Sequence, residues 1–532
     1  MKQYLTKAIN IPLGVTQQET AKRICRSLNI RESDLQSFRL YKRSVDARDK
    51  SNVHFVCSYV AATSARPANA APYAPPVNVL DNAPALRSDI RVLVVGSGPA
   101  GLFSALYLAK CGLNVTVIER GSDISERKSK VTSFFNGGEL DENCNVQFGL
   151  GGAGTFSDGK LTTGTSSKLI YTVFDQFVRS GAPRDILTDA LPHVGTDKLE
   201  QVVANMRDEI ISYGGKFMFD TALSDLVVSN GSVAFAEVIR NGKTERLKAD
   251  CIILACGHSA RDTFEMLSLR GAEMSFKPFA VGLRIEHERE FINRAQYGEL
   301  FAAHRDLSSA SYKLVNNCAD GRGCYSFCMC PGGAVVAAAS ERNSVVVNGM
   351  SDCARKADNS NSAIVVTVNA ADISSFGYGE DTFAGVRFQR DLERKAFVLG
   401  GGNYVAPCQN AADFIANATS ASFVVSPSYS RGVRSVNLRT LLPKEISDDL
   451  ASSLAYFNNR IKGFADFGVL TGVETRTSSP VRIVRREDFQ SNIRNLYPVG
   501  EGAGYAGGIV SSAVDGLRAA MSIANGIAKK TA

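Results

Sequence analysis

Three glycines and one acidic residue form the pattern that most clearly predicts ligand chemistry in this chain. Gly96, Gly98 and Gly101 have G-x-G-x-x-G spacing, and Glu119 follows Gly101 by 18 residues. The first glycine permits a tight turn, the second lets the backbone approach a pyrophosphate, and the third lets a helix lie close to a strand. A carboxylate at Glu119 can accept both hydroxyl protons of a ribose. These residues predict dinucleotide binding, and a glycine-rich turn in an ordinary α/β core is the alternative.

Cysteines in the segment GCYSFCMCPGG are a second candidate for chemistry. Zinc and iron–sulfur sites use four ligands, usually with C-x-x-C spacing. Here Cys324, Cys328 and Cys330 have C-x-x-x-C-x-C spacing with only Cys318 nearby, so we predict no metal. Two interpretations remain: a redox-active or nucleophilic thiol, with Cys330 and Cys328 as candidates, or buried small side chains in a strand-to-turn segment.

One histidine and two arginines could also act on a substrate. His258 stands at the start of an expected helix, as a general acid or base or as a residue that contacts backbone. Arg284 alternates with apolar residues in GLRIEH, where it shares a strand face with Glu286 as a substrate wall or as an ion pair. Arg476 lies in the polar segment ETRTSS and could bind a substrate anion.

The chain around the three glycines has the pattern of a complete βαβ unit. An apolar run at 92–95 predicts a strand buried on both faces, 102–111 a helix that ends at Gly112, and 115–118 a second strand that ends on Glu119. The helix N-terminus would direct its free N–H groups and its positive dipole end toward an anion.

A second strand–glycine–helix arrangement occurs near the end of the chain. A short strand at 496–499 precedes Gly500 and Glu501, and a glycine-rich turn leads to a helix from about Ile509. The segment 249–257 predicts a further buried strand. The second arrangement suits another part of the same ligand.

Glycine is dense between residues 145 and 164, where the side chains are small or hydroxylated. Such a segment is a poor helix or packed strand. It can wrap closely around a flat ring and offer backbone N–H groups to it. A flexible surface loop is the alternative, although the apolar residues Phe148, Leu150 and Phe156 argue against it.

Composition shifts divide the chain. We expect a small α+β domain (1–60), an Ala- and Pro-rich linker (61–88), the first part of the dinucleotide-binding domain (89–270), an inserted β-rich substrate domain with few long helices (271–470), and the C-terminal part of the dinucleotide-binding domain (471–532). In the first domain, Thr16 and Glu19 predict a capping box. Its charged turn at 42–50 is either a solvated hairpin tip or a docking surface for an anionic partner such as RNA.

The overall composition limits the function classes. A chain of 532 residues with 44% hydrophobic and 21% charged residues is typical of a globular protein of two or three domains. We find no long apolar run free of charge and no signal peptide, so no membrane span is expected. The net charge of +7 is diffuse and permits nucleic-acid binding without demanding it. Scattered cysteines predict free thiols in a reducing compartment, the cytoplasm.

Long motifs carry a family resemblance. The βαβ unit, ADCIILACG and YPVGEGAGYAGG together resemble glutathione-reductase-type FAD enzymes. FGLGGAGTFSDGKL, KPFAVGLRIEH, YSFCMCPGG, NGMSDCAR, TGVETRTSSPVRI and GEGAGYAGGIVSSAVDG resemble a family of uncharacterised FAD-dependent dehydrogenases, whose N-terminal domain carries a KRSVDAR-like segment, here 42–48. The resemblance implies an α/β fold: a Rossmann-like FAD-binding domain with an inserted β-rich substrate domain and a small N-terminal α+β domain.

The resemblance also implies a set of FAD-binding positions. Those near the pyrophosphate and adenosine ribose are Gly96, Gly98, Pro99, Ala100, Gly101, Glu119, Arg120 and Gly257. Those near the ribityl chain and ring are Gly151, Gly152, Gly154, Gly500, Glu501, Gly507, Gly508 and Ile509. Glu501 stands where flavoproteins usually have Asp, so its reach is longer by one methylene.

The sequence has no second βαβ fingerprint, because no apolar helix follows the glycines at 400–402. NAD(P)H would therefore bind transiently against the flavin, or electrons enter from another donor. We predict an FAD-dependent oxidoreductase that exchanges hydride between the flavin and an unidentified small-molecule substrate. The alternatives are an FAD-dependent RNA-modifying or RNA-associated protein and a flavin-bound regulatory or structural protein without turnover.

Overall fold

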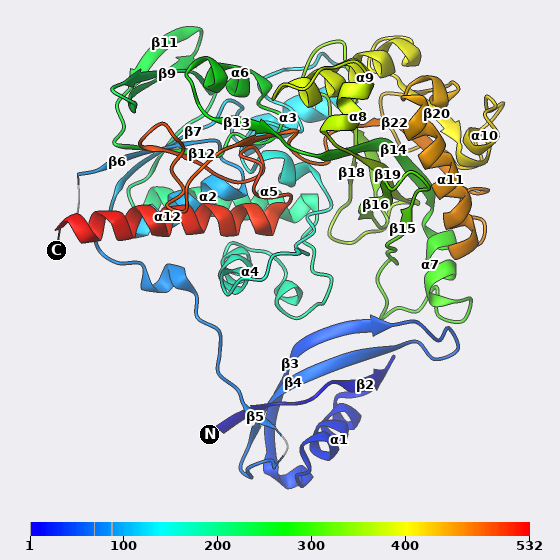
Figure 1. The fold of residues 1–532 in the computed structure, drawn as a ribbon. Coiled ribbons are helices and arrows are strands. Elements are labelled where there is room, and N and C mark those ends of the chain that lie inside the picture. Colours follow the sequence, from blue (N-terminus) through cyan, green and yellow to red (C-terminus); the bar gives the residue numbers. More distant parts are fainter. Residues whose placement is uncertain (1, 69, 87–88, 532) are drawn as a thin grey trace.

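A five-stranded parallel sheet forms the centre of the fold in the computed structural model, which describes residues 2–68, 70–86 and 89–531 (Figure 1). Its strands, in spatial order, are β8 (Lys216–Met218), β7 (Asn114–Ile118), β6 (Arg91–Val95), β12 (Cys251–Leu254) and β24 (Leu496–Pro498). The chain order runs outward from β6 in both directions, as in doubly wound nucleotide-binding folds. Ligands of such sheets bind beyond the carboxyl ends of the strands, where the order reverses. The predicted Rossmann-like arrangement is confirmed.

The helices of this domain pack around the sheet. They are α2 (Pro99–Lys110), α3 (Ile124–Phe135), α4 (Leu169–Arg179), α5 (Thr196–Ser212), α6 (Arg261–Leu269) and α12 (Ile509–Thr531), with short helices η3 (Gly152–Phe156) and η4 (Arg184–Leu187). Residues 100–109 of α2 are all buried, so this helix lacks an exposed polar face. The long α12, red in Figure 1, crosses α2 closely at Gly516, where a Cβ would lie 2.2 Å from the Ala100 carbonyl oxygen.

A three-stranded antiparallel sheet lies beside the parallel one. It consists of β9 (Thr221–Ser229), β10 (Ser232–Arg240) and β11 (Lys243–Leu247). Its two tight turns have Asn–Gly pairs with positive φ, 51° at Asn230 and 51° at Asn241, which suits two-residue hairpins.

The inserted domain is built on a seven-stranded sheet. The strands in spatial order are β15 (Val315–Asn317), β16 (Gly323–Cys330), β19 (Asn359–Val368), β14 (Phe279–Glu288), β22 (Val469–Glu474), β20 (Ala406–Asn410) and β21 (Val433–Ser435). Two-stranded sheets join β17 (Ala334–Ala337) to β18 (Val347–Met350), and β13 (Met274–Phe276) to β23 (Val481–Ile483). The second pair brings the entry and exit of the insertion together.

Helices cover this sheet more extensively than the sequence suggested. They are α7 (Arg289–Tyr297), α8 (Ala370–Ser375), α9 (Ala384–Gly400), α10 (Ala411–Ile415), α11 (Lys444–Arg460) and the short η5 (Leu438–Thr440). Two of these helices are long, since α9 and α11 have 17 residues each, and both pack their apolar faces into the sheet core. The glycines at 400–402 end α9, with Gly401 in the left-handed C-cap conformation.

The N-terminal domain packs α1 (Gln17–Leu28) on one antiparallel sheet. Its strands are β1 (Lys2–Leu5), β2 (Ile9–Pro12), β3 (Leu35–Asp46), β4 (His54–Thr63) and β5 (Ala71–Pro72), with a short helix η1 (Glu32–Asp34). Thr16 and Glu19 form the predicted capping box at the start of α1. The sequence did not reveal β1, β2 or β5, which are short and lack a clear alternation.

The segment that follows β4 is only partly free of the rest of the molecule. A short helix, η2 (Val79–Asn82), docks against α4, since Asn78 donates a hydrogen bond to Asp175 at 2.7 Å and Asp81 pairs with Arg179 at 2.6 Å. Residues 74–77 are exposed and have no regular structure. In the described part of the chain, no helix has the length and hydropathy that a membrane span requires.

The charged hairpin tip between β3 and β4 contacts the main body. Arg43 forms a bidentate ion pair with Asp189, and its backbone exchanges hydrogen bonds with Thr188 and Ala190. Lys50 donates to the carbonyl oxygen of Ala295 at the end of α7. Figure 1 shows the hairpin reaching beneath this helix. Neither sequence interpretation anticipated the contacts of Arg43 and Lys50 with the main body, although Lys42, Arg48 and Asp49 of the same tip are exposed, as the solvated-tip interpretation expects.

Candidate functional site

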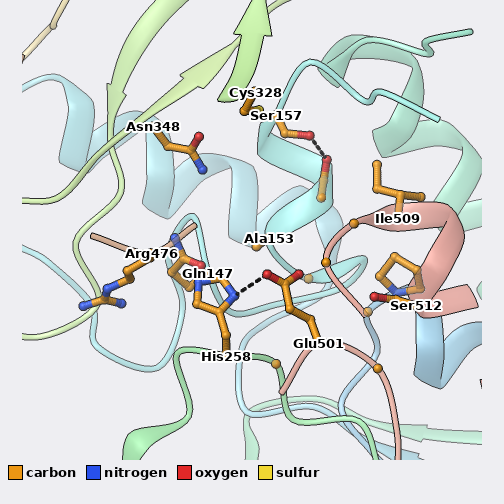
Figure 2. Close-up of a pocket in the computed structure, with 18 of the residues that line it drawn as sticks. Gln147, Ala153, Ser157, His258, Cys328, Asn348, Arg476, Glu501, Ile509 and Ser512 are labelled. Atoms are coloured by element: carbon orange, nitrogen blue, oxygen red, sulfur yellow. Dashed lines mark hydrogen bonds and ion pairs between the residues drawn. The ribbon is translucent and has the colours of Figure 1, made fainter. Parts of the chain in front are cut away.

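A cavity of about 770 Å³ connects the carboxyl ends of the parallel strands with the seven-stranded sheet. One end, which we call the fingerprint end, is lined by Gly98, Glu119, Gly257 and Glu501. The other, the sheet end, is lined by residues of β16, β18 and β22 and by neighbouring loop residues. Figure 2 shows both ends, with Glu501 and His258 at one and Cys328 and Asn348 at the other. The volume lies in the upper part of the range for ligand pockets.

The three fingerprint glycines have different local surroundings. A Cβ on Gly96 would lie 2.4 Å from the Ala255 carbonyl oxygen, and one on Gly101 would lie 2.0 Å from the Gly96 carbonyl oxygen. Both positions therefore require glycine for packing, as the sequence predicted. Gly98 is the N-cap of α2 and lacks a side-chain cap, so the first N–H groups of the helix remain available at the cavity wall. Pro99 and Ala100 line the cavity beside it.

The C-terminal segment forms the opposite wall. Gly500, Glu501, Gly507, Gly508 and Ile509 all line the cavity. A Cβ on Gly507 or Gly508 would meet no atom within 4 Å, so both glycines leave open space in front of the start of α12. The other predicted positions divide into those on the cavity wall, which are Arg120, Gly152, Gly154 and Gly257, and those behind it, which are Gly101 and Gly151.

The carboxylate of Glu119 accepts hydrogen bonds from the protein with both of its oxygens, so it presents no free oxygen to a ligand. Its Oε2 accepts hydrogen bonds from the backbone N and Oγ of Ser97, both at 2.8 Å. Its Oε1 accepts from the backbone N of Gly121 at 3.1 Å and of Gly149 at 2.9 Å. A carboxylate has about four acceptor positions. All four are used within the protein, so the prediction that Glu119 accepts both ribose hydroxyl protons does not fit this arrangement.

The glycine-rich segment wraps around a buried arginine. Arg127 of α3 is fully buried and donates hydrogen bonds to the carbonyl oxygens of residues 145, 146, 149 and 150 at 2.7–3.2 Å. Burial lowers the pKa of Arg127 to about 10. A Cβ on Gly149 would lie 2.2 Å from Arg127 Cδ, which explains why glycine stands there. The segment at 145–150 therefore encloses a guanidinium, while Gly152 and Gly154 reach the cavity.

His258 and Glu501 face each other at the fingerprint end. His258 Nδ1 lies 3.3 Å from Glu501 Oε1, and Figure 2 shows both side chains at the cavity wall. His258 Nε2 is buried and has no hydrogen-bond partner among the residues that the structure describes. An unpaired buried ring nitrogen costs free energy unless a ligand pairs with it. Glu501 is therefore tied to a histidine, and the histidine has a nitrogen left for a ligand.

The two candidate cysteines differ in position. Cys328 lines the cavity in a β-bulge with φ of 44°, whereas Cys330 is fully buried behind it and donates to the Cys328 carbonyl oxygen at 3.3 Å. The proximity of the Cys330 thiol and the positive charges of Lys160 and Arg284 lower the pKa of Cys328, while that of Cys330 is raised. Of the two, Cys328 is the thiol with both access and activation.

Arg476 reaches the cavity wall, but protein side chains already occupy its guanidinium. Its Nε and Nη2 donate to Glu393 at 3.1 and 2.9 Å, and its Nη1 donates to Ser259 and Ser340. Glu393 also accepts two hydrogen bonds from Arg261, and the two arginines hold its pKa well below the usual range against the effect of burial. The prediction that Arg476 binds a substrate anion does not fit this closed network.

Arg284 lies outside the cavity wall. It is fully buried and pairs with Glu474 through two hydrogen bonds at 2.9 and 3.0 Å. Glu286, which was expected on the same face, instead accepts from Asn359 and Ser428. The ion-pair interpretation of Arg284 is correct in kind, but the partner is Glu474 on the neighbouring strand β22. Arg284 supports the wall from behind.

Several residues that line the cavity were not predicted as site residues from the sequence. They are Gln147, Asp158, Lys160, Gln296, Tyr312, Lys313, Asn348, Arg355 and Glu474. Asp158 and Arg355 form a buried ion pair although 197 residues separate them. Motifs that carried the family resemblance could have drawn attention to some of them, since FGLGGAGTFSDGKL contains Asp158 and Lys160, NGMSDCAR contains Asn348 and Arg355, and TGVETRTSSPVRI contains Glu474.

Family comparisons divide the chain as the structure does. Residues 90–296 match the family described as "Pyridine nucleotide-disulphide oxidoreductase", and residues 278–477 match "FAD-dependent protein, C-terminal domain-like". Residues 1–61 match a domain of unknown function. The RNA-associated and the regulatory alternatives have no support in these matches.

Known proteins similar to the chain include one long relative. A protein of Clostridium beijerinckii described as "Uncharacterized protein" is 42% identical over 524 residues, covering 96% of this chain and 97% of its own length. Solved structures with a remote likeness include a flavin-dependent brominase (12% identity, covering 82% of this chain and 80% of its own, TM-score 0.38) and L-proline dehydrogenase from P. horikoshii (12%, 82% and 94%, TM-score 0.35). No conclusion is drawn from likeness at that level. The chain belongs to the family of the Clostridium beijerinckii protein, and it carries a pyridine nucleotide-disulphide oxidoreductase domain and an FAD-dependent domain.

Proposed function

We propose that the cavity holds FAD at its fingerprint end and a small-molecule substrate at its sheet end, between which hydride is exchanged. The observation that supports this proposal most directly is the single cavity itself. It joins the uncapped N-terminus of α2 and the start of α12 to a wall of the inserted domain that carries an activated thiol.

The residues at the fingerprint end fit a bound dinucleotide. Gly257, Gly507 and Gly508 leave open space where any side chain would intrude, and the nearest atom to a Cβ on Gly98 would be 3.8 Å away. His258 Nε2 adds a buried polar group that has no hydrogen-bond partner in the described part of the chain. Two helix N-termini stabilise negative charge, one near the position proposed for the pyrophosphate and the other near the position proposed for the flavin ring. When bound, the flavin supplies the two-electron redox chemistry.

We assign different roles to the side chains around the ligand. The His258–Glu501 pair orients the cofactor through His258 Nε2 and can hold a proton there. Cys328 faces the sheet end, where its thiolate can accept a proton from the substrate. The Arg261–Glu393–Arg476 network keeps the loop at 474–477 in place between the two domains.

The identity of the electron donor needs an experiment of its own. Since the glycines at 400–402 end a helix rather than start a second nucleotide fold, we propose that NAD(P)H, if it is the donor, binds transiently in this same cavity. All twelve cysteines are described and are free thiols, which supports a reducing compartment such as the cytoplasm. Anaerobic mixing with NADH and with NADPH separates a nicotinamide donor, which bleaches the flavin absorption, from another donor, which leaves it unchanged.

Cofactor identity is the direct test of the proposal. The purified protein should be yellow and should release FAD, rather than FMN, on denaturation. Gly98→Val should reduce the FAD content, because its side chain would occupy the cavity, whereas Gly526→Val changes an exposed position of α12 with open space around it and should leave the FAD content unchanged. Recovery of FMN alone, or a colourless protein that takes up no added FAD, would refute the proposal.

A further inference from the structure

We infer that the sheet end of the cavity is a subsite for a carboxylate group of the substrate. This inference rests on the proposed function and adds the chemical class of the substrate. The subsite consists of Lys160, Tyr312, Lys313 and Asn348, with Cys328 beside them on the same wall.

Within the described ranges, the charged groups of the cavity wall form ion pairs, except Lys160, Lys313 and Glu119, whose oxygens accept four hydrogen bonds from neutral protein groups. Asp158 is paired with Arg355, Glu474 with Arg284, Arg476 with Glu393, Arg120 with Asp262 and Glu501 with His258. Lys160 and Lys313 line the cavity, and neither forms an ion pair with a residue that the structure describes. Lys160 is half-buried, so its charge is partly desolvated. The wall therefore has an excess of positive charge at the sheet end.

Asn348 adds a neutral donor. Its Oδ1 accepts hydrogen bonds from Arg284 Nη2 at 3.2 Å and from the backbone N of Gly349 at 2.8 Å. These two donors identify the oxygen of the amide and leave its NH₂ group for another partner. Figure 2 shows Asn348 on the cavity wall, with the amide end of its side chain directed toward the middle of the cavity.

Tyr312 lines the cavity beside Lys313 and is 8% exposed. Burial raises the pKa of its hydroxyl, and the neighbouring Ser362 hydroxyl opposes this rise. Its ring packs edge-on against Phe464, so Tyr312 is a fixed part of the wall beside Lys313.

The available donors select a carboxylate over other anions. Two ammonium groups and one amide NH₂ group match the acceptor positions of a carboxylate. The acceptors on this wall are used, since Glu474 accepts twice from Arg284, and Asp158 accepts from Arg355 and Ser351. The arginine forks that suit phosphate are likewise bound to protein carboxylates. A neutral substrate would leave both lysines without a counter-charge.

Calorimetric titration tests this inference on the purified full-length protein, with and without added FAD. The probes are malonate, succinate and benzoate, each compared with its amide at constant ionic strength. At least one carboxylate should bind saturably, and its amide should bind at least tenfold more weakly. Lys160→Met and Lys313→Met should each weaken carboxylate binding by roughly tenfold, the effect of one charge-assisted hydrogen bond. Lys168→Met, which changes an exposed lysine outside the cavity, is the matched control and should not alter binding.

The outcomes separate the inference from the proposed function. If no probe binds saturably, if the amides bind as well as the acids, or if the two lysine variants behave like the control, the carboxylate subsite is refuted. A lysine variant that loses FAD places that lysine in the cofactor site and also refutes its role here. Failure to take up FAD refutes the cofactor assignment instead, and the calorimetric result with carboxylates stands independently of it.

Discussion

Replacing Arg127 by methionine should loosen the glycine-rich segment and weaken cofactor binding. The guanidinium is fully buried and donates four hydrogen bonds to backbone carbonyls between residues 145 and 150. Methionine keeps most of the side-chain length but donates none of these bonds. The same segment supplies Gln147 and Phe148 to the cavity wall and leads into Gly152.

The magnitude follows from the groups left unpaired. Each buried carbonyl without a donor costs about 1–3 kcal/mol, and local relaxation and entering water reduce the sum. Removing a buried charge-assisted network typically costs about 3–5 kcal/mol in total. If roughly 2 kcal/mol of this must be recovered when the cofactor orders the segment, the FAD dissociation constant rises about 30-fold.

Fluorescence titration of FAD and thermal unfolding of the same samples would measure both effects. Arg127→Lys keeps the charge and part of the donor set, so it should fall between the natural protein and Arg127→Met. Lys128→Met is the matched control on the next position of α3, because Lys128 forms a half-exposed ion pair with Glu200 whose loss costs at most about 1 kcal/mol. If Arg127→Met binds FAD and unfolds like Lys128→Met, the segment is held by other contacts and the reasoning is wrong.

Further predictions concern the thiols and the N-terminal domain. Because its pKa is lowered, Cys328 should be alkylated by iodoacetamide at pH 6.5, where Cys353, whose pKa burial raises, reacts slowly; mass spectrometry of the labelled peptides checks this, and equal labelling contradicts it. The preference should shrink as the pH rises toward 9, since ordinary thiols then ionise as well. Arg43→Glu should speed hydrogen exchange around Asp189, which it contacts, whereas Lys42→Glu, on an exposed neighbour, should not. A broad-specificity protease should cut first within 74–77, and a first cut elsewhere would show that this segment is protected.

The nucleotide-binding fold could be predicted from the sequence because its signals are local. The role of Gly101 depends on the backbone of Gly96, five residues away, although Gly96 itself packs against the distant Ala255. The strand, turn and helix between residues 91 and 110 follow each other without interruption. Periodicity and glycine spacing record such short-range constraints directly. The same holds for the second arrangement before Ile509.

Some helices and strands outside the nucleotide-binding fold were not predicted, because their formation depends on contacts that are distant in the sequence. The helix α9 was missed because it packs into the sheet core with many polar residues on its outer face, which hides the apolar stripe in a sequence of mixed composition. The three short N-terminal strands β1, β2 and β5 owe their structure to pairing with distant segments rather than to their own propensity.

Only the tertiary structure decided how the candidate side chains are used. Types and spacing suggested that Glu119, Arg284 and Arg476 bind ligands, yet each is occupied by protein groups, which for the two arginines lie far away along the chain. Arg284 and Glu474, for example, are 190 residues apart. Conversely, Lys160 and Lys313 became candidates because nothing in the described chain pairs with them at the cavity wall. Hydrogen-bond and charge pairing are properties of folded surroundings, so residue types in a sequence predict which groups can react but not which remain free to do so.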